Sequence, residues 1–294
     1  MIDLLYEYTE DDLMLQGTYF DSNKKDVCIL FIHGQAQSIV GNEFAYKWGK
    51  YFSSNGISFL YGHNRGYDFI NCMVNKEGNF VYNGATFEIF EDSLKDIDLW
   101  VNKIKELGYK RVILLGHSLG CNKVLYYISK YQENIDGVIF ASAPDMVGIT
   151  KKEEKYFNEL YNEAINSEDN KLLSKLLCGT DYISAATFIN ENTEDNPIDN
   201  FPIERNPKVF NQLSTVTIPV LSLCGSNEYP TYLKQELLKE KAINCNDYTF
   251  KIIENTNHLY QNKEEKVSLL ILNWIKERYL INGRRLTPNK NEVI

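Results

Sequence analysis

A serine between two glycines is the feature of this sequence that most directly indicates chemistry. Ser118 lies in the pentapeptide GHSLG, which follows the apolar run RVILL and precedes the helix-like stretch CNKVLYYISK. This context predicts a tight turn from a strand into a helix, so that the free N–H groups and positive end of the helix face the hydroxyl. A serine hydroxyl is a weak nucleophile, so it also needs a base, a group that orients the base, and donors for an oxyanion.

The chain has four histidines, and one of them stands where a base could act. His258 follows the last apolar run and precedes the last long helical pattern, at the sheet edge where ligands collect in folds of this kind. We expect His258 to exchange a proton with Ser118. The other three are expected to be structural: His117 packs inside the turn, His33 braces the loop after the first central strand, and His63 belongs to a turn.

Two carboxylates could orient the histidine. Glu228 lies in CGSNEYP, three residues after Gly225, in a turn that follows the buried run PVLSL. It also completes the chain order serine, acid, histidine that such sites use. Asp145 in FASAPD follows the preceding strand and is the alternative. The turn context favours Glu228 as the orienting acid, and a solvated loop carboxylate is the ordinary interpretation of either residue.

Backbone N–H groups of Leu119 and Gln35 are the expected donors to the oxyanion. Leu119 follows the serine and opens the helix, while Gln35 directly follows Gly34 in the loop FIHGQAQS. These groups suffice for acyl chemistry, so no metal or organic cofactor is implied. The six cysteines also show neither CxxC pairs nor zinc-like spacing.

Short apolar runs alternate with longer helical patterns along the chain. The runs are continuous rather than alternating, which is typical of strands covered on both faces. They lie at residues 27–32, 57–61, 111–115, 137–141, 218–223 and 248–253. Apolar residues three and four apart predict helices over residues 85–107 and 267–278. The alternation predicts an α/β fold with a mainly parallel, doubly wound sheet, and the first twenty residues predict an antiparallel pair at one edge.

More than seventy residues without a good strand separate the fourth and fifth of these runs. Residues 151–177 have a helical pattern, and the stretch NENTEDNPIDNFPIERNP that follows later has the composition of a loop. An insertion of that length usually forms a lid or cap. We therefore expect a core of residues 1–145 and 211–294, with a helical cap of residues 146–210 after the sixth strand. Residues 151–200 carry 11 acidic and 5 basic side chains, either as a solvated helical face or as a gate that selects by charge.

The composition restricts the classes of partner. The 294 residues are 44% apolar and 24% charged, as in an ordinary soluble globular protein. A net charge of −9 leaves no basic face for nucleic acid. No apolar run approaches 18 residues and no basic segment precedes one at the N-terminus, so we expect neither a membrane span nor a signal peptide. Scattered cysteines in apolar runs favour free thiols and a cytoplasmic location. The oligomeric state is not indicated.

These segments together resemble the α/β-hydrolase superfamily over nearly the whole chain. FIHGQAQS is similar to its oxyanion loop, GHNRG to its Asp-x-Arg-Gly loop, GHSLG to its nucleophile elbow, CGSNEYP to its acid turn and NTNH to its histidine turn. Glutamate stands where the family usually has aspartate. The stretches NRGYDF and GATFEIFEDSLKDI are similar to a little-characterised branch whose fungal members include siderophore esterases. The resemblance also implies that the chain is not a dehalogenase of this fold, because those enzymes use a carboxylate as the nucleophile and this chain has a serine.

Residues and resemblance together predict a serine hydrolase that cleaves a small carboxylic ester or thioester through an acyl-enzyme on Ser118. Acyl transfer to an acceptor other than water is one alternative, because it would use the same three side chains. A hydrolase-like binding protein that has lost turnover is the other. The substrate itself is not indicated, since the expected cap carries no recognisable motif.

Overall fold

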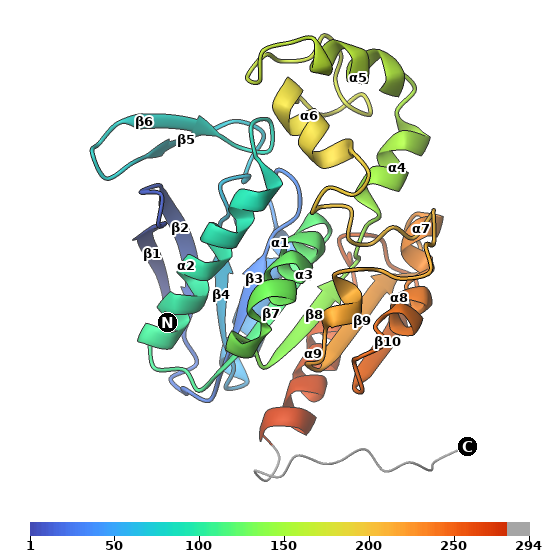
Figure 1. Cartoon of the computed structure of the whole chain (residues 1–294). Coiled ribbons are helices and arrows are strands. Elements are labelled where there is room, and N and C mark those ends of the chain that lie inside the picture. Colours follow the sequence, from blue (N-terminus) through green and yellow to red (C-terminus); the bar gives the residue numbers. More distant parts are fainter. Residues whose placement is uncertain (281–294) are drawn as a thin grey trace.

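A sheet of eight strands runs through the computed structural model, which describes residues 1–280 of the chain (Figure 1). The strand order is β1-β2-β4-β3-β7-β8-β9-β10. The strands are β1 (Ile2–Tyr8), β2 (Met14–Phe20), β3 (Val27–Ile32), β4 (Ser58–Gly62), β7 (Arg111–His117), β8 (Gly137–Ala141), β9 (Val220–Gly225) and β10 (Tyr248–Ile253). All pairs from β4 to β10 are parallel, whereas β1 and β2 join the edge antiparallel. The predicted mainly parallel sheet with an antiparallel pair at its edge is confirmed.

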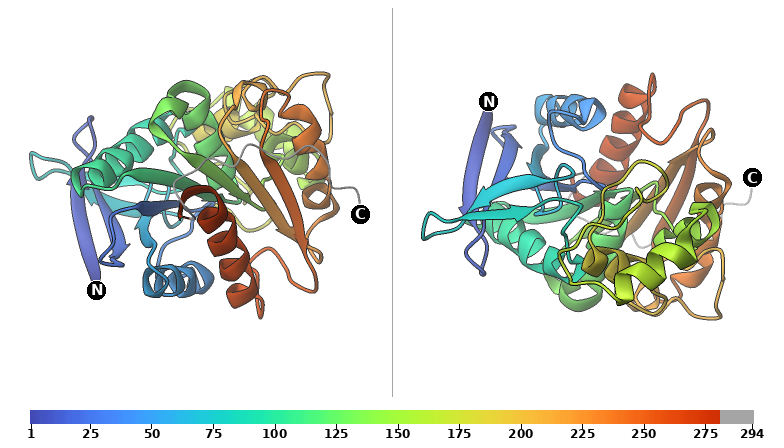
Figure 2. Two further views of the ribbon diagram at one scale, coloured as in Figure 1. Left: turned by 90° about the horizontal axis from the view of Figure 1, so that it is seen from below. Right: turned by 90° about the horizontal axis from the view of Figure 1, so that it is seen from above.

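Helices cover both faces of the sheet (Figure 2). On one face lie α1 (Glu43–Ser54) and α9 (Glu264–Ile275), and on the other lie α2 (Ser93–Glu106), α3 (Leu119–Tyr131) and α8 (Glu236–Lys241). Each face has its own apolar core, which contains Trp48 on the first and Trp100 on the second, both fully buried. The doubly wound arrangement is therefore confirmed. No helix within the described residues is long and apolar enough to cross a membrane.

The predicted elements differ from the observed ones mainly at their ends. The strands expected at residues 57–61, 111–115 and 218–223 are shifted or extended by one or two residues. The helix expected from residue 85 begins at Ser93, because the preceding loop is held elsewhere: Thr86 O accepts hydrogen bonds from Ser184 N and Thr187 Oγ1. The hairpin of β5 (Asn71–Val74) and β6 (Phe80–Asn83) was not predicted, since its strands are only four residues long and partly exposed.

The long insertion forms helices above the carboxyl ends of the strands, at the top of Figure 1. They are α4 (Met146–Glu153), α5 (Phe157–Ile165) and α6 (Ala185–Asn192), and α5, α6 and the segment between them enclose a small apolar cluster around Phe188. The helical prediction for residues 151–177 is wrong beyond Ile165, where the polar run NSEDN ends α5 and turns with isolated bridges follow. That residues 146–210 act as a cap stays a prediction.

Candidate active site

Ser118 lies in a strained turn between β7 and α3. Its φ of 54° and ψ of −129° are unusual for a residue with a side chain. The two flanking glycines make the turn possible: a Cβ on Gly116 would lie 2.4 Å from Gly120 O, and one on Gly120 would lie 2.1 Å from Ile32 O. The backbone thus presents a half-buried serine at the carboxyl edge of the sheet, in the geometry of a nucleophile elbow.

The parallel strands carry the other predicted residues to the same edge. Glu228 comes three residues after β9, and His258 comes five residues after β10, next to it in the sheet. His258 Nδ1 lies 2.8 Å from Glu228 Oε2. A carboxylate can only accept, so Nδ1 carries the proton and Nε2 keeps its lone pair for another partner. The Glu228 side chain is fully buried, whereas that of His258 is 33% exposed.

Tyr232 and His117 link the histidine to the serine. The Tyr232 ring lies 4.9 Å from the His258 ring, centroid to centroid, and burial raises the pKa of its phenol while a hydrogen bond with Ser118 lowers it. His117 is buried next to Ser118, and its Nε2 lies 2.8 Å from His258 O. Because a carbonyl only accepts, His117 donates this hydrogen bond and anchors the histidine loop. Sequence analysis expected His117 to pack and did not single out Tyr232, which belongs to no recognisable motif.

Among the described residues, no hydrogen bond joins the Ser118 hydroxyl directly to the His258 ring. Such contacts are often long in ligand-free sites and tighten when a substrate binds. Burial, with a smaller contribution from His258, holds the pKa of His117 well below its usual range. A neutral His117 leaves His258 as the partly exposed imidazole at this edge of the sheet.

The loop after β3 lies against the serine. A Cβ on Gly34 would lie 2.9 Å from Ser118 Cβ, so the two backbones are in close contact. His33 is fully buried, lies 2.8 Å through Nδ1 from Gly34 O, and accepts a hydrogen bond from Asn64 N at Nε2. His33 therefore stabilises the loop after β3, as the sequence predicts. Gln35 follows Gly34 in this loop, and Leu119 is the first residue of α3, whose N–H has no partner within the helix.

Asp145, the alternative acid, is occupied by backbone groups. Its Oδ1 accepts from Gly148 N at 2.8 Å and caps α4, while its Oδ2 accepts from Glu204 N at 2.7 Å. Burial raises the pKa of this carboxyl, and the two backbone hydrogen bonds oppose the shift. The carboxylate therefore joins α4 to a later part of the insertion, and it is Glu228 that contacts the imidazole.

A buried cluster of charged residues lies behind the serine, and sequence analysis did not identify it. Lys123, one turn further along α3, pairs with Glu88 in the loop before α2, and both side chains are fully buried. Glu191 of α6 is buried next to them. Burial, reinforced by the charge of Glu88, raises the pKa of Glu191 well above its usual value, while Lys123 opposes the shift. The cluster connects the insertion to the core.

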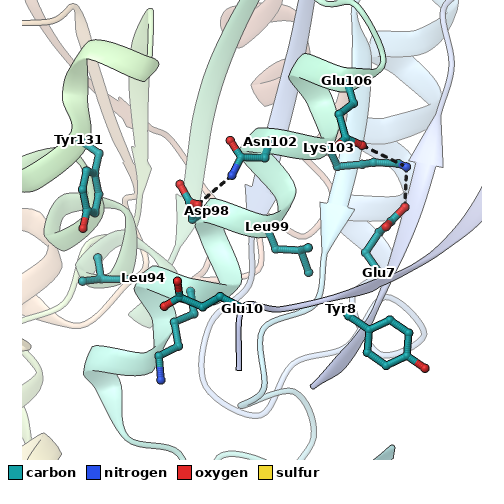
Figure 3. A pocket seen from close by; sticks show the side chains of 11 residues that line it. Glu7, Tyr8, Glu10, Leu94, Asp98, Leu99, Asn102, Lys103, Glu106 and Tyr131 are labelled. Carbon is teal, nitrogen blue, oxygen red and sulfur yellow. Dashed lines mark hydrogen bonds and ion pairs between the residues drawn. The ribbon is translucent and has the colours of Figure 1, made fainter. Parts of the chain in front are cut away.

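Other parts of the described chain offer no comparable chemistry. No group of three or more histidine, cysteine, aspartate or glutamate side chains within residues 1–280 could hold a metal ion. A groove of about 330 Å³ lies between β1 and α2 (Figure 3). Some of its charged side chains pair with one another, for example Lys103 with Glu7 at 2.6 Å. It contains neither a histidine nor a serine, so we assign no catalytic role to it.

Comparisons with known proteins agree with this fold. Residues 27–262 match the model of a protein family described as the alpha/beta hydrolase fold. No curated protein sequence matches the chain. Among solved structures, the chain is similar to the alpha/beta hydrolase GrgF from Penicillium sp. sh18, with a TM-score of 0.70, 14% identity, and coverage of 95% of this chain and 99% of that one.

Two further solved structures are similar over most of their length. Est1E from Butyrivibrio proteoclasticus, in a complex with ferulic acid, has a TM-score of 0.65 and 15% identity, with coverage of 92% of this chain and 98% of that one. The Pyrococcus furiosus esterase Pf2001 has a TM-score of 0.60 and 15% identity, with coverage of 94% and 90%. At this low sequence identity, the structural similarities show that the chain shares the fold of these proteins.

Proposed function

The chain belongs to the alpha/beta hydrolase fold family, and we propose that it is a serine esterase that cleaves a small carboxylic ester or thioester. The observation that carries the proposal is the contact of 2.8 Å between the His258 ring and the buried Glu228 carboxylate, at the sheet edge that presents Ser118. Structurally similar proteins that are named esterases support an ester rather than an amide as the substrate.

The first half of the proposed reaction acylates the serine. Ser118 Oγ attacks the carbonyl carbon while His258 Nε2 takes the hydroxyl proton. The carbonyl oxygen becomes an oxyanion, which accepts hydrogen bonds from the N–H groups of Leu119 and Gln35. When the tetrahedral intermediate collapses, the bond to the alcohol or thiol breaks, and His258 gives its proton to that leaving group. The acyl group stays on Ser118 as an ester.

The second half restores the enzyme by the same groups. His258 takes a proton from a water molecule, which attacks the acyl carbon, and the acid product leaves when Ser118 Oγ regains the proton. Glu228 keeps the imidazole in the tautomer with Nδ1 protonated and stabilises the imidazolium of both steps. An acceptor other than water would turn the same acyl-enzyme into an acyltransferase, so the products decide between these two activities.

A hydrolysis screen tests the proposal. We expect the wild type to hydrolyse p-nitrophenyl esters at neutral pH, with a preference for short acyl chains, and Ser118→Ala to lower kcat by about 10³-fold or more. Ser129→Ala is the matched control, because Ser129 lies on the same helix and its hydroxyl binds only a local carbonyl, Tyr126 O. Retention of more than about a tenth of kcat by Ser118→Ala would exclude this serine as the nucleophile.

A further inference from the structure

Ser142 contacts the acid of the proposed site, and Tyr260 contacts Ser142. Ser142 directly follows β8, which lies between the strands that carry Ser118 and Glu228. Its Oγ lies 2.7 Å from Glu228 Oε1 and 2.6 Å from the Tyr260 hydroxyl, and both Ser142 and Tyr260 are fully buried. Tyr260 comes two residues after His258, so the histidine loop supplies both the base and one end of this chain of hydroxyls.

The chemistry of the groups fixes the direction of these hydrogen bonds. Glu228 as a carboxylate can only accept, so the one hydrogen of Ser142 points to Oε1. Ser142 Oγ then accepts the one hydrogen of Tyr260 at 2.6 Å, and Leu223 O at 3.4 Å is a more distant second acceptor for it. Oε1 also accepts from Gly225 N, and Oε2 accepts from His258 Nδ1. Each donor in such a chain polarises the next, so Tyr260 makes Ser142 a stronger donor to the carboxylate.

The backbone at Ser142 indicates that its hydroxyl matters. Its φ is +60°, in the left-handed region that favours glycine and costs free energy for a residue with a side chain. Serine occupies the position nevertheless, and its side chain makes two hydrogen bonds there, both to groups of the proposed site. Backbone strain of this kind collects at functional sites, where surrounding contacts maintain it.

We propose that Ser142 and Tyr260 are positioning residues that hold the Glu228 carboxylate in the orientation that contacts His258. This inference rests on the proposed function, because it assigns a role within that site. Without the Ser142 hydroxyl, Oε1 keeps a single donor, and the carboxylate is both freer to turn and more ready to accept a proton. The serine and tyrosine touch neither the substrate nor the reacting atoms.

Other titratable groups around the Glu228–His258 pair do not provide an alternative. They are His117 from β7, Cys121 from α3, Cys224 from β9, Tyr232 from α7 (Pro230–Leu233) and Tyr260. Burial lowers the pKa of His117 well below its usual range and raises the pKa of Cys224 to about 12. It also raises the pKa of Cys121 and of both tyrosines. Each of these shifts favours the neutral form of the group.

The test compares kcat/KM as a function of pH in the wild type, Ser142→Ala and Tyr260→Phe. We expect Ser142→Ala to lower kcat about tenfold with KM nearly unchanged, and to move the acid limb of the profile to higher pH. The acid limb moves to higher pH because the Ser142 hydroxyl stabilises the negative charge on Glu228. Without this donor, the Glu228–His258 pair binds an additional proton more readily. Tyr260→Phe should also lower kcat and move the acid limb to higher pH, but by smaller amounts than Ser142→Ala.

Two controls make the result specific. Tyr127→Phe removes another fully buried tyrosine hydroxyl that bonds a carboxylate, Asp98, away from the site, and should leave the acid limb in place. The double variant Ser142→Ala/Tyr260→Phe should be no worse than Ser142→Ala alone, because the tyrosine acts through the serine. Melting temperatures identify any variant that is merely unstable, and Ser142→Gly serves as a second variant without the hydroxyl or the strain.

The outcomes separate this inference from the proposed function. An active wild type with an unmoved acid limb in Ser142→Ala and Ser142→Gly, or with additive effects in the double variant, would overturn the positioning role and leave the esterase proposal intact. A wild type whose hydrolysis does not depend on Ser118 would overturn the proposed function, and with it the positioning role.

Discussion

At the scale of single residues, the two carboxylates considered for the acid have different surroundings. Glu228 contacts the His258 ring and accepts hydrogen bonds from Ser142 and Gly225. Asp145 binds two backbone N–H groups and contacts neither imidazole nor serine. The longer side chain of glutamate reaches the imidazole from a turn that begins directly after β9. The contacts therefore favour Glu228 for catalysis and Asp145 for stability.

This assignment predicts opposite effects of two amide substitutions. Glu228→Gln should keep the fold and lower kcat by about 10²-fold or more, because the amide cannot stabilise an imidazolium and presents a donor to the protonated Nδ1. Asp145→Asn should leave kcat nearly unchanged and lower the unfolding free energy by about 1 kcal/mol, because its amide group cannot accept from Glu204 N. Steady-state kinetics and urea unfolding measure the two effects.

The reverse pattern, with a silent Glu228→Gln and an inactive Asp145→Asn, would move the acid to the end of β8. Ser118 and His258 would keep their proposed roles in that case. If neither substitution changed kcat, a serine–histidine dyad would remain.

At the scale of elements, the junction between α6 and the core depends on a buried proton. Glu191 lies next to the Lys123–Glu88 pair, and burial followed by the charge of Glu88 raises the pKa of its carboxyl well above the usual value. The folded chain thus holds this proton more tightly than the unfolded chain does. The stabilisation that the protonated Glu191 carboxyl provides is fully present below the usual pKa of a glutamate, about 4. It is lost as the pH rises through the pKa of Glu191 in the folded chain.

Glu191→Gln therefore should change the pH dependence of stability. The amide keeps the shape of the side chain and removes its titration, so we expect the variant to melt at a higher temperature than the wild type at pH 8. The two melting temperatures should converge as the pH approaches about 4. Glu168→Gln, on the exposed surface of the insertion, is the control and should show no such difference. A constant difference between Glu191→Gln and wild type at every pH would show that Glu191 does not titrate with unfolding.

Elements that bury a continuous apolar surface were predictable from sequence, and those decided by tertiary contacts were not. The run VCILFI is buried at every position and forms a strand with the bounds expected. The stripe of α2 was recognised, but its start was placed too early because α6, nearly a hundred residues away, holds the loop at Thr86. The second half of the helical prediction in the insertion failed because residues 166–177 satisfy their backbone by turns and bridges instead.

The same division applies to the candidate site. Ser118, His258 and Glu228 were predictable because each has a local signature, namely a glycine-flanked turn or a position directly after a strand. Ser142 and Tyr260 have no such signature, and their contacts arise only when β8, β9 and the histidine loop meet. Lys123 has no such signature either, since its partner Glu88 lies 35 positions earlier in the chain.

At the scale of the whole molecule, the sheet brings groups from distant parts of the chain to one edge. The carboxyl ends of β3, β7, β8, β9 and β10 lead in turn into the loop of Gly34 and Gln35, Ser118, Ser142, Glu228 and His258. The insertion that carries most of the net negative charge lies above this edge (Figure 1). We expect it to influence which esters reach the serine, whereas the chemistry depends on the sheet edge alone.

The central claim is that Ser118 is the nucleophile, and covalent labelling tests it most directly. The native protein is treated with a fluorophosphonate probe, digested, and the labelled peptide identified by mass spectrometry. We predict one adduct per chain, located on Ser118, formed rapidly by the wild type and by Ser129→Ala and lost in Ser118→Ala. His258→Ala should form it far more slowly, because the base is missing. Labelling of another residue, or none by a folded wild-type protein, would contradict the assignment of Ser118 as an activated nucleophile.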